Sequence, residues 1–532
     1  MKLQINNLIS NTIQHSSFKW SFFIFALIYS LSHVFFGLDF TDTFFWLNML
    51  DDYSKYPMVS GTLYIGKIIG NLLHDNLLTF RLLTWIFGLF AFIIPFIFLI
   101  PEKIKYLNFL SLSIILIRNP IFGVDITTLF FASIISTSII WNYNNNKISI
   151  EIFNSIIISF LIFVRFPNII VVFLYIFITL INNKLGIINK IRNVFLVLTC
   201  VIVSFYLITI FLHESTQNYF DIINNQISNS VLNSDYTLSS LLMRYIEDFI
   251  KILIGSLFLV LIDYIYRYGI NRKGINRFLI QSFTLLLFIA FCYLIIYKNA
   301  YRWYDRLFLT SIFIYLLSLS FKYKKLNYNN LHIILIISLL ALTSISGSNT
   351  GFLKFSPLII AFLPIIIYYL KIENNLNTNI YPYIATLLVC FMLCHSKPYE
   401  DSRFIYLRKT ADSIPKLKNI LSTSERIDFV NDVLVNSQNY SNREVVYLGN
   451  CSHIFNYLTK SETLNIPFKM EMTNFKEIDM FINRYYKGKP VIFYTPNYPP
   501  NEINQDDIIL NKYMFSIGYN RIEKRGYNIY TK

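Results

Sequence analysis

Residues 191–212 read IRNVFLVLTCVIVSFYLITIFL and are apolar over almost their whole length. A helix of this kind crosses the hydrocarbon core of a bilayer, which takes about 20 apolar residues. Across all 532 residues, 55% are hydrophobic and 14% are charged. A water-soluble domain carries roughly 25% charged residues. A chain with so few charges cannot cover itself with a wetted surface, so we expect lipid to be its solvent.

Similar apolar runs recur through residues 1–395, and they predict about thirteen membrane spans. The runs lie near residues 18–37, 78–100, 104–117, 126–141, 149–164, 167–182, 191–212, 249–266, 278–297, 306–321, 331–346, 353–370 and 381–395. The shorter runs must be tilted or partly sheltered by neighbouring helices. The first run is long and lacks a small-residue cleavage site, so we expect a retained anchor rather than a signal peptide.

Basic loops between these runs predict the orientation in the membrane. With the N-terminus inside, every cytoplasmic loop is basic, as the positive-inside rule requires. The loop residues are Lys103, Lys105, Lys147, Lys184, Lys190, Arg192, Arg267, Arg272, Lys273, Arg277, Lys322, Lys324, Lys325 and Lys371. This placement explains the net charge of +15 without nucleic acid as a partner. Because abundant Asn, Ile, Lys and Tyr suggest an AT-rich bacterial genome, we expect a multi-pass protein of the bacterial cytoplasmic (inner) membrane.

Residues 396–532 differ in kind from residues 1–395, and we expect two domains with this boundary. Their mixed helix-like and strand-like patterns predict a small α/β domain, placed outside by the odd number of spans. Helices are predicted at about 403–420, 424–437 and 474–486, and strands at Val445–Leu448, Val491–Tyr494 and in a hairpin of Arg521–Lys524 with Tyr527–Tyr530. The predicted fold class is a membrane all-α protein with this extracytoplasmic α/β domain and an amphipathic surface helix in the first outer loop.

The first outer loop, about 38–77, carries carboxylates where the first span leaves the membrane. Asp39 and Asp42 lie three residues apart, a spacing that suits a general base and an orienting partner. The alternative is that Asp39 caps a helix and the other carboxylate is simply solvated. In the second half of the loop, Ser60–Leu73 has apolar residues at helical spacing, so we expect an amphipathic helix along the membrane surface and a lid-like loop.

Arginines lie at the predicted outer ends of other spans, against the orientation bias. Arg118, Arg165 and Arg302 are the main examples. Carrying a charge toward the bilayer core costs roughly 2.5–3.5 kcal/mol, which a bound phosphate anion would offset because guanidinium groups match phosphate oxygens. The alternative for any one of them is that it reaches a lipid headgroup or pairs with a nearby aspartate. As a set on one face, they favour a phosphate site.

The histidines and cysteines give no sign of metal or nucleophile chemistry. The 7 histidines form no HxxxH or HExxH pair, and the 5 cysteines form no CxxC pattern. Any metal would have to be held by carboxylates, for which Asp39, Asp42 and Asp125 are the candidates. We therefore expect no cofactor and leave a divalent cation open.

The order of these features resembles the GT-C superfamily of polytopic glycosyltransferases. It runs from Asp39-Phe40-Thr41-Asp42-Thr43 through Lys55-Tyr56-Pro57 and the amphipathic stretch to Arg81 at the mouth of the second span, and then to Asp125 after a proline. The branch with lipid A aminoarabinose transferases and protein mannosyltransferases is the most similar. Asp42 falls on the acidic position of that family's loop, whereas Thr43 stands where a second acid is common.

The resemblance implies transfer of a sugar from a polyprenyl-phosphate donor to an acceptor on the outer face, in cell-envelope glycan or lipid modification. It makes Asp42 the base, with Asp39 as its partner and Asp125 matching the acidic residue that opens the fourth span. The donor phosphate would be bound by cations, for which the candidates are Lys55, Arg81, Arg118, Arg165 and Arg302. Transfer would proceed with inversion at the anomeric carbon. The expected partners are this lipid-linked donor, a lipid, glycan or protein acceptor, and the membrane.

Three other functions stay open on the sequence. A lipid-linked oligosaccharide flippase would place charges at mid-span depth, whereas here they lie at outer ends. An O-antigen-type polysaccharide polymerase would have its large outer loop between late spans, and the loop at about 213–248 keeps that alternative open. In a structural or sensor protein, the C-terminal domain would bind a ligand.

Overall fold

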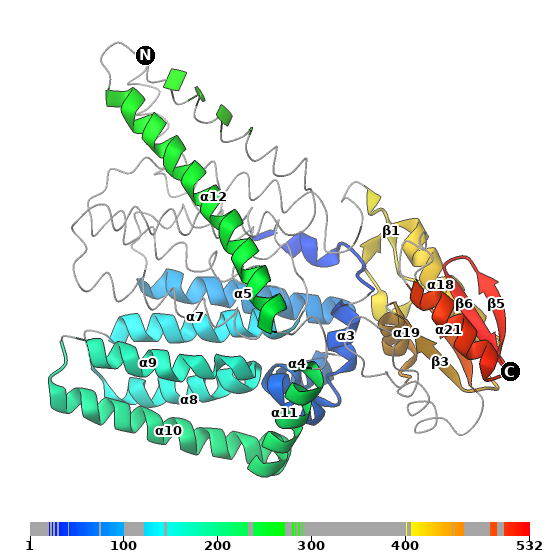
Figure 1. The fold of residues 1–532 in the computed structure, drawn as a ribbon, viewed down its shortest axis with the longest axis horizontal. Coiled ribbons are helices and arrows are strands. Elements are labelled where there is room, and N and C mark those ends of the chain that lie inside the picture. Colours follow the sequence, from blue (N-terminus) through cyan, green and yellow to red (C-terminus); the bar gives the residue numbers. More distant parts are fainter. Residues whose placement is uncertain are drawn as a thin grey trace.

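The computed structural model describes residues 31–40, 42–73, 76–99, 122–142, 146–182, 184–231, 238–271, 401, 406–449, 451–461, 490–496 and 505–532, together with single helical positions between 21 and 28 and between 279 and 290. A helical bundle occupies one side and a small sheet domain the other, with helix α3 (Asp42–Asn48) between them (Figure 1). The fold is thus mostly helical with a small sheet region near the C-terminus, as predicted.

Long apolar helices make up the bundle, and most of them run side by side (Figure 1). These helices are α5 (Leu77–Leu99), α7 (Val124–Asn142), α8 (Ile148–Val164), α9 (Ile170–Ile181), α10 (Ile187–His213) and α12 (Leu238–Asn271). The shorter elements of this part are α3 (Asp42–Asn48), α4 (Ser60–Leu73), α11 (Thr216–Val231) and the 3-10 turns η1 (His33–Phe35), η2 (Tyr53–Lys55), η3 (Pro57–Val59) and η5 (Phe166–Ile169).

Two helices in the described part of the chain are long and apolar enough to cross a membrane, namely α7 and α10. They differ in their surroundings, since 61% of the most apolar window of α7 is buried against 17% for α10. Shorter apolar helices lie at Leu77–Ala91, Ile148–Val164 and Phe166–Ile181. Several predicted spans lie outside the described residues, so the number of about thirteen stays a prediction.

Helix α4 occupies the predicted amphipathic stretch, and it packs through its small residues. Its buried face consists of Ser60, Gly61, Thr62, Leu63, Gly66 and Gly70. A Cβ atom at Gly61 would lie 2.9 Å from the carbonyl carbon of Phe163, so only glycine lets the α4 backbone approach α8 this closely. On the opposite face Ile68 and Leu72 are exposed. Placement of this face on the membrane surface stays a prediction.

The predicted outer ends of the bundle helices meet around α4. The Oγ1 atom of Thr62 is 2.7 Å from the Oγ1 atom of Thr127, near the start of α7. The same Thr62 hydroxyl donates to the carbonyl of Val164 at the end of α8. His213, at the end of α10, is 2.9 Å from the hydroxyl of Ser60. The start of α7 and the ends of α8 and α10 therefore lie at one end of the bundle, while the order and sidedness of the membrane spans stay a prediction.

The C-terminal domain is built on one four-stranded sheet with the order β3-β4-β6-β5. Strands β3 and β4 are parallel, β4 and β6 are antiparallel, and β5 and β6 form a hairpin. The bounds are β3 Val445–Leu448, β4 Val491–Tyr494, β5 Asn520–Lys524 and β6 Tyr527–Thr531, with helices α18 (Ser424–Gln438), α19 (Ser452–Thr459) and α21 (Gln505–Ser516). The predicted strands, the hairpin and the helix at 424–437 thus match the structure.

The predicted helix at about 403–420 is wrong. The chain there forms strand β1 (Lys409–Thr410), the 3-10 turn η10 (Pro415–Leu417) and strand β2 (Leu421–Ser422), which pairs with β1. Pro415 has no amide hydrogen and cannot continue a helix ladder. Asn419 has a φ of 67°, which also breaks a right-handed helix. The predicted helix at 474–486 and the boundary at 395/396 lie outside the described residues.

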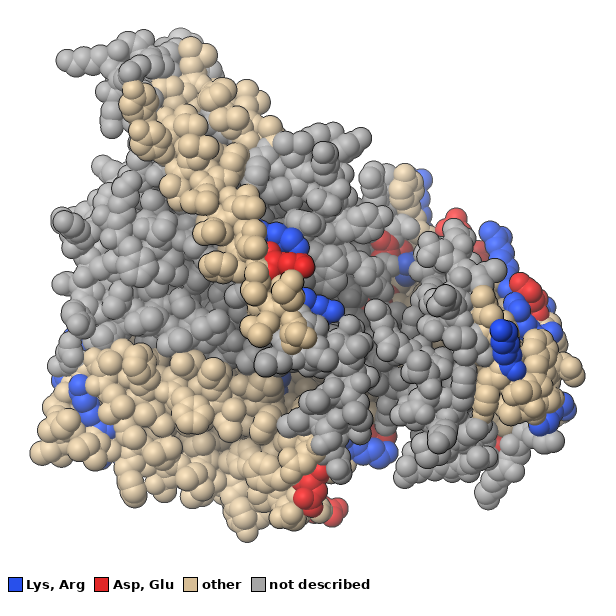
Figure 2. Space-filling model, viewed as in Figure 1, with Lys and Arg blue, Asp and Glu red and all other residues tan. Residues whose placement is uncertain are grey.

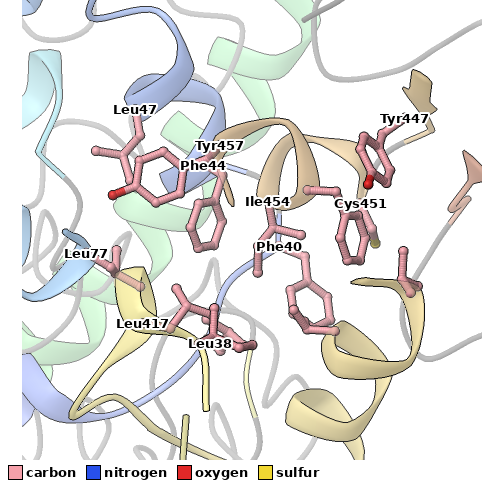
Figure 3. Close-up of a cluster of buried hydrophobic side chains, with 14 of the residues drawn as sticks. Leu38, Phe40, Phe44, Leu47, Leu77, Leu417, Tyr447, Cys451, Ile454 and Tyr457 are labelled. Carbon is pink, nitrogen blue, oxygen red and sulfur yellow. The ribbon is translucent and has the colours of Figure 1, made fainter. Parts of the chain in front are cut away.

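One hydrophobic core joins the C-terminal domain to the first outer loop. It includes Leu38, Phe40 and Phe44 of the loop, together with Leu417 and Ile454 from the C-terminal domain, all buried. Figure 3 shows the side chains of the two parts interleaved in a single cluster. Fully burying side chains of this size contributes about 1.5–3 kcal/mol each. The C-terminal domain and the first loop are therefore one packed unit.

The close approach of α4 to α8 predicts that Gly61→Leu destabilises the protein. The added side chain meets the backbone of Phe163 and Val164, which cannot turn away as a side chain can. We expect a loss of roughly 1–3 kcal/mol or more in the free energy of unfolding, measured by thermal unfolding of the full chain in detergent. Gly186→Leu is the matched control because a Cβ at Gly186 has nothing within 4 Å. Equal melting temperatures for both variants would contradict this packing.

Candidate functional site

The segment Val34–Asp39, where the first outer loop begins, is held by side chains from distant parts of the chain. Arg81, buried near the start of α5, donates from Nη1 to the carbonyls of Val34 and Phe36, at 3.2 Å each, and from Nη2 to that of Gly37 at 2.6 Å. A guanidinium group satisfies several acceptors at once because its donors have a fixed fork geometry. Arg81 therefore fixes the turn by which the chain enters the loop.

The next residue, Leu38, is bound by an ion pair of the C-terminal domain. Its amide donates to Oδ2 of Asp401 at 2.7 Å, and its carbonyl accepts from Nη1 of Arg426. Asp401 and Arg426 are themselves paired, with 3.2 Å between Oδ1 and Nε, and the Asp401 side chain is fully buried. The hydroxyl of Ser422 also donates to Asp401 at 2.6 Å. Both backbone groups of Leu38 thus have charged partners.

A backbone contact reinforces the same junction. Phe36 bridges to Leu421 in parallel, and the amide of Gly37 donates to the carbonyl of Leu421 at 2.8 Å. Gly37 has a φ of 89°, a region that favours glycine because other residues would be strained there. The loop entrance therefore pairs with strand β2 of the C-terminal domain.

Asp39 lies next in this buried set of charges and caps α3. Its Oδ2 accepts from the amide of Thr43 at 2.8 Å, as the capping interpretation expected. Arg81 interacts electrostatically with both Asp39 and Asp401. With Arg426, the junction holds two positive and two negative side chains, so the buried charges balance.

Helix α3, which begins at Asp42, rests on α19 of the C-terminal domain. The ring of Phe45 stands edge-on to that of His453, with 5.3 Å between centroids, and Phe44 is 5.4 Å from Tyr457. Asn48 donates to the carbonyl of His453 at 2.9 Å. Both ends of α3 are therefore anchored, one through Asp39 and the other through α19.

A second group of polar residues lies where α8 and α10 end and α12 begins. Arg165 is buried directly after α8 and interacts electrostatically with Tyr245 of α12. Tyr245 also interacts electrostatically with Asp248. It directly follows Phe163 and Val164, the residues in contact with Gly61. Tyr219 of α11 is fully buried, and no partner for its hydroxyl is found within the described ranges.

The predicted site residues fall into distinct places. Asp39 and Arg81 meet at the junction, while Arg165 belongs to the second group. Lys55 is largely exposed and pairs with Asp52 at 2.8 Å. Asp125 is half-buried in the first turn of α7, two residues after Gly123, which contacts Trp46 of α3. Asp42 is the first residue of α3, and Arg118 and Arg302 lie outside the described residues.

A metal site was left open by the sequence. Within the described ranges, no group of three His, Cys, Asp or Glu side chains is arranged to hold a metal ion.

Sequence reasoning missed Asp401, Arg426 and Tyr245. The Leu38 amide is 363 residues from Asp401, and the Leu38 carbonyl is 388 residues from Arg426, so no local pattern connects them. The one available signal was that Asp401 lies close after the predicted last span, which ends at residue 395, and a charge there is ordinary. Tyr245 gave no signal, because an aromatic residue near a predicted span end is common.

No protein-family model matches this chain, and no curated protein matches it significantly. Among solved structures, the chain is similar to the archaeal oligosaccharyltransferase AglB from Archaeoglobus fulgidus, in complex with an inhibitory peptide and a dolichol-phosphate. The TM-score is 0.47 and the sequence identity 10%, over 96% of this chain and 74% of that one. A TM-score and a sequence identity this low do not assign the chain to a family.

The contact of α3 with α19 predicts a pH-dependent stability. Burial lowers the pKa of His453 to about 4, against about 6.5 in an unfolded chain. Between these values the unfolded chain binds a proton that the folded chain excludes. Stability is therefore lost as the pH falls from about 6.5 toward 4, by up to about 3 kcal/mol, and it is unaffected by this group above that window.

Unfolding of the full chain in detergent at pH 7 and pH 5 measures this effect. His453→Phe keeps an aromatic ring against Phe45 but has no titrating group. We expect the variant to lose less stability than the wild-type chain on acidification. An identical pH dependence in both proteins would show that His453 does not contribute.

Proposed function

We propose that this protein is an integral membrane glycosyltransferase that moves a sugar from a polyprenyl-phosphate donor to an acceptor at the extracytoplasmic face. The reaction would serve cell-envelope glycan or lipid modification. The proposal joins the motif order of the first loop with two features of the structure, a bundle with exposed apolar side chains and the anchored helix α3, which begins at Asp42.

The exposed apolar surface of α10 supports the membrane part of the proposal. Phe195, Ile202 and Phe211 on this helix are each more than 60% exposed, although such side chains belong in an apolar medium. The described helices present a broad surface with few charges on the face shown in Figure 2, whereas charged side chains gather on the C-terminal domain. Lipid suits the apolar surface of the bundle, because exposing such a large apolar surface to water is unfavourable.

The observation that carries the catalytic part is the anchored start of α3. Asp42 is its first residue, Asp39 caps it, and α19 supports its other end. A general base is effective when its position is fixed before the reaction, because no reorganisation is then needed. This helix lies beside the converging ends of the bundle helices, where a lipid-borne donor would enter from the bilayer.

In the proposed reaction, Asp42 accepts the proton of the acceptor hydroxyl, whose oxygen attacks the anomeric carbon. The bond from that carbon to the phosphate oxygen breaks, and the polyprenyl phosphate leaves from the opposite face with inversion. Arg165 is our choice among the described cations to stabilise the leaving phosphate, because it lies buried directly after the end of α8 on which α4 of the loop packs. Arg118 and Arg302 join it in the proposal.

We assign Asp39 and Arg81 to holding the loop, since both side chains form hydrogen bonds with backbone groups of residues 34–43. Lys55 remains a proposed phosphate contact that must first release Asp52, and Asp125 remains a proposed second acid. A divalent cation stays open. An O-antigen-type polymerase or a flippase is the alternative function.

The proposal predicts that Asp42→Asn abolishes glycosyl transfer, by about 100-fold or more, while donor binding stays near normal. The amide keeps the shape of the side chain but cannot accept the proton. Transfer is measured with a polyprenyl-phosphate sugar and an envelope acceptor in detergent or nanodiscs. Asp51→Asn is the matched control, because Asp51 belongs to the same loop and its side chain is 90% exposed. Full turnover by Asp42→Asn would discard the role of Asp42.

If Arg165 binds the donor phosphate, Arg165→Ala weakens donor binding by about 10-fold or more, since a hydrogen bond to a charged group contributes about 1.5–3 kcal/mol. Acceptor affinity should change little. Direct binding of polyprenyl phosphate to the purified chain measures the effect. Arg192→Ala is the control, because Arg192 lies near the start of α10, beside the start of α8, whereas Arg165 follows the end of α8. Equal donor affinity in both variants would contradict a phosphate contact by Arg165.

A further inference from the structure

We propose that Asp401 and Arg426 of the C-terminal domain are positioning residues, which set the catalytic competence of the first outer loop by binding both backbone groups of Leu38. This inference rests on the proposed function, because it takes Asp42 as the base of the reaction. It gives the C-terminal domain a role in the membrane reaction.

The ion pair is built to recognise one backbone unit. Asp401 uses Oδ1 for Arg426 and Oδ2 for the amide of Leu38, and Arg426 uses Nε for Asp401 and Nη1 for the carbonyl of Leu38. The two side chains and one peptide segment thus form a closed ring of charge-assisted hydrogen bonds. Such bonds are shorter and stronger than those between neutral groups.

Burial makes the ring sensitive to the loss of either partner. The Asp401 side chain is fully buried and that of Arg426 is 10% exposed. Ser422 holds the carboxylate from one side, and the guanidinium group lies 4.9 Å from the ring centroid of Phe40. Removing one charge leaves the other without its partner in a region with little water, so the loop entrance must rearrange.

Movement of Leu38 passes directly to the start of α3. Asp39 follows Leu38 in the chain, and its carboxylate caps the amide of Thr43 in the first turn of α3. Asp42 lies in that same turn. A displacement of about 1 Å at a catalytic group can lower a rate by about 100-fold. The C-terminal domain therefore reaches the proposed base through three consecutive linkages, from the ion pair to Leu38, from Asp39 to Thr43, and along the helix turn.

The test is Asp401→Asn in the full-length chain, with two readouts. We expect kcat to fall by about 10- to 100-fold with the KM for the lipid donor changed less than about 3-fold, because the donor contacts lie elsewhere. In hydrogen exchange followed by mass spectrometry, peptides covering residues 36–44 should lose protection, since the amides of Leu38 and Thr43 lose or loosen their acceptors. Both readouts should respond together.

Milder variants guard against simple misfolding. Ser422→Ala removes one hydrogen bond to Asp401 and keeps the ion pair, and Arg426→Lys keeps the charge but cannot bind Asp401 and Leu38 as a planar fork does. Both should shift kcat and exchange in the same direction as Asp401→Asn, but less. Asp428→Asn is the matched control, because it breaks the exposed pair with Lys409 on the same domain and leaves the bonds of Asp401 and Arg426 to Leu38 intact. It should match the wild-type chain in both readouts.

Three results would overturn the inference. These are unchanged exchange of residues 36–44 in Asp401→Asn, lost protection without any fall in kcat, and an equal effect of Asp428→Asn. A failure of the proposed function is recognised separately, since the wild-type chain would then transfer no sugar and Asp42→Asn would change nothing. The exchange experiment needs no substrate and decides the link between the ion pair and the loop on its own.

Discussion

Asp401 and Arg426 take the amide and the carbonyl of Leu38 out of water and give each a charged partner. A buried peptide group without partners costs a large part of the stability of a small domain. A buried ion pair without further hydrogen bonds is equally unfavourable. At this junction the ion pair supplies the partners of the Leu38 peptide groups, and these groups supply the further hydrogen bonds that the ion pair needs. This arrangement forms only when the loop and the C-terminal domain are docked. The shared hydrophobic core around Phe40 and Phe44 follows from that docking.

The bundle supplies the second constraint, which is close approach. Glycines along α4 let the ends of α7, α8 and α10 meet around one short helix, with Ser60 and Thr62 binding groups on each. Small residues let helices approach closely where the surrounding medium gives no hydrophobic driving force between them. The polar contacts of Ser60 and Thr62 therefore gather at one end of the bundle, and α3 lies beside that end. The position of α3 at this end of the bundle is thus a result of packing as well as of charge.

Much of the fold was predictable from local patterns. The runs Val445–Leu448 and Val491–Tyr494 are short, apolar and rich in β-branched or aromatic residues, and the turn Arg525-Gly526 marks the hairpin. The stretch at 403–420 has helix-like spacing of its apolar residues, but Pro415 and the positive φ of Asn419 prevent a helix there. In the site, Asp39 and Arg81 stood out by charge and position, but their partners are backbone groups, which carry no mark in the sequence. The ion pair with Leu38 was beyond prediction because its members are joined only by the folded chain.

The long separation between Leu38 and its partners also sets the order in which the molecule matures. Ribosomes add residues from the N-terminus at about 5–20 per second, so a gap of 363 residues corresponds to roughly 20–70 seconds. During that interval residues 34–39 are already synthesised, while the carboxylate and guanidinium groups that bind Leu38 do not yet exist. A nascent or truncated chain is consequently unable to assemble the junction. Synthesis of the C-terminal domain is therefore the step that allows the junction with Leu38 to close.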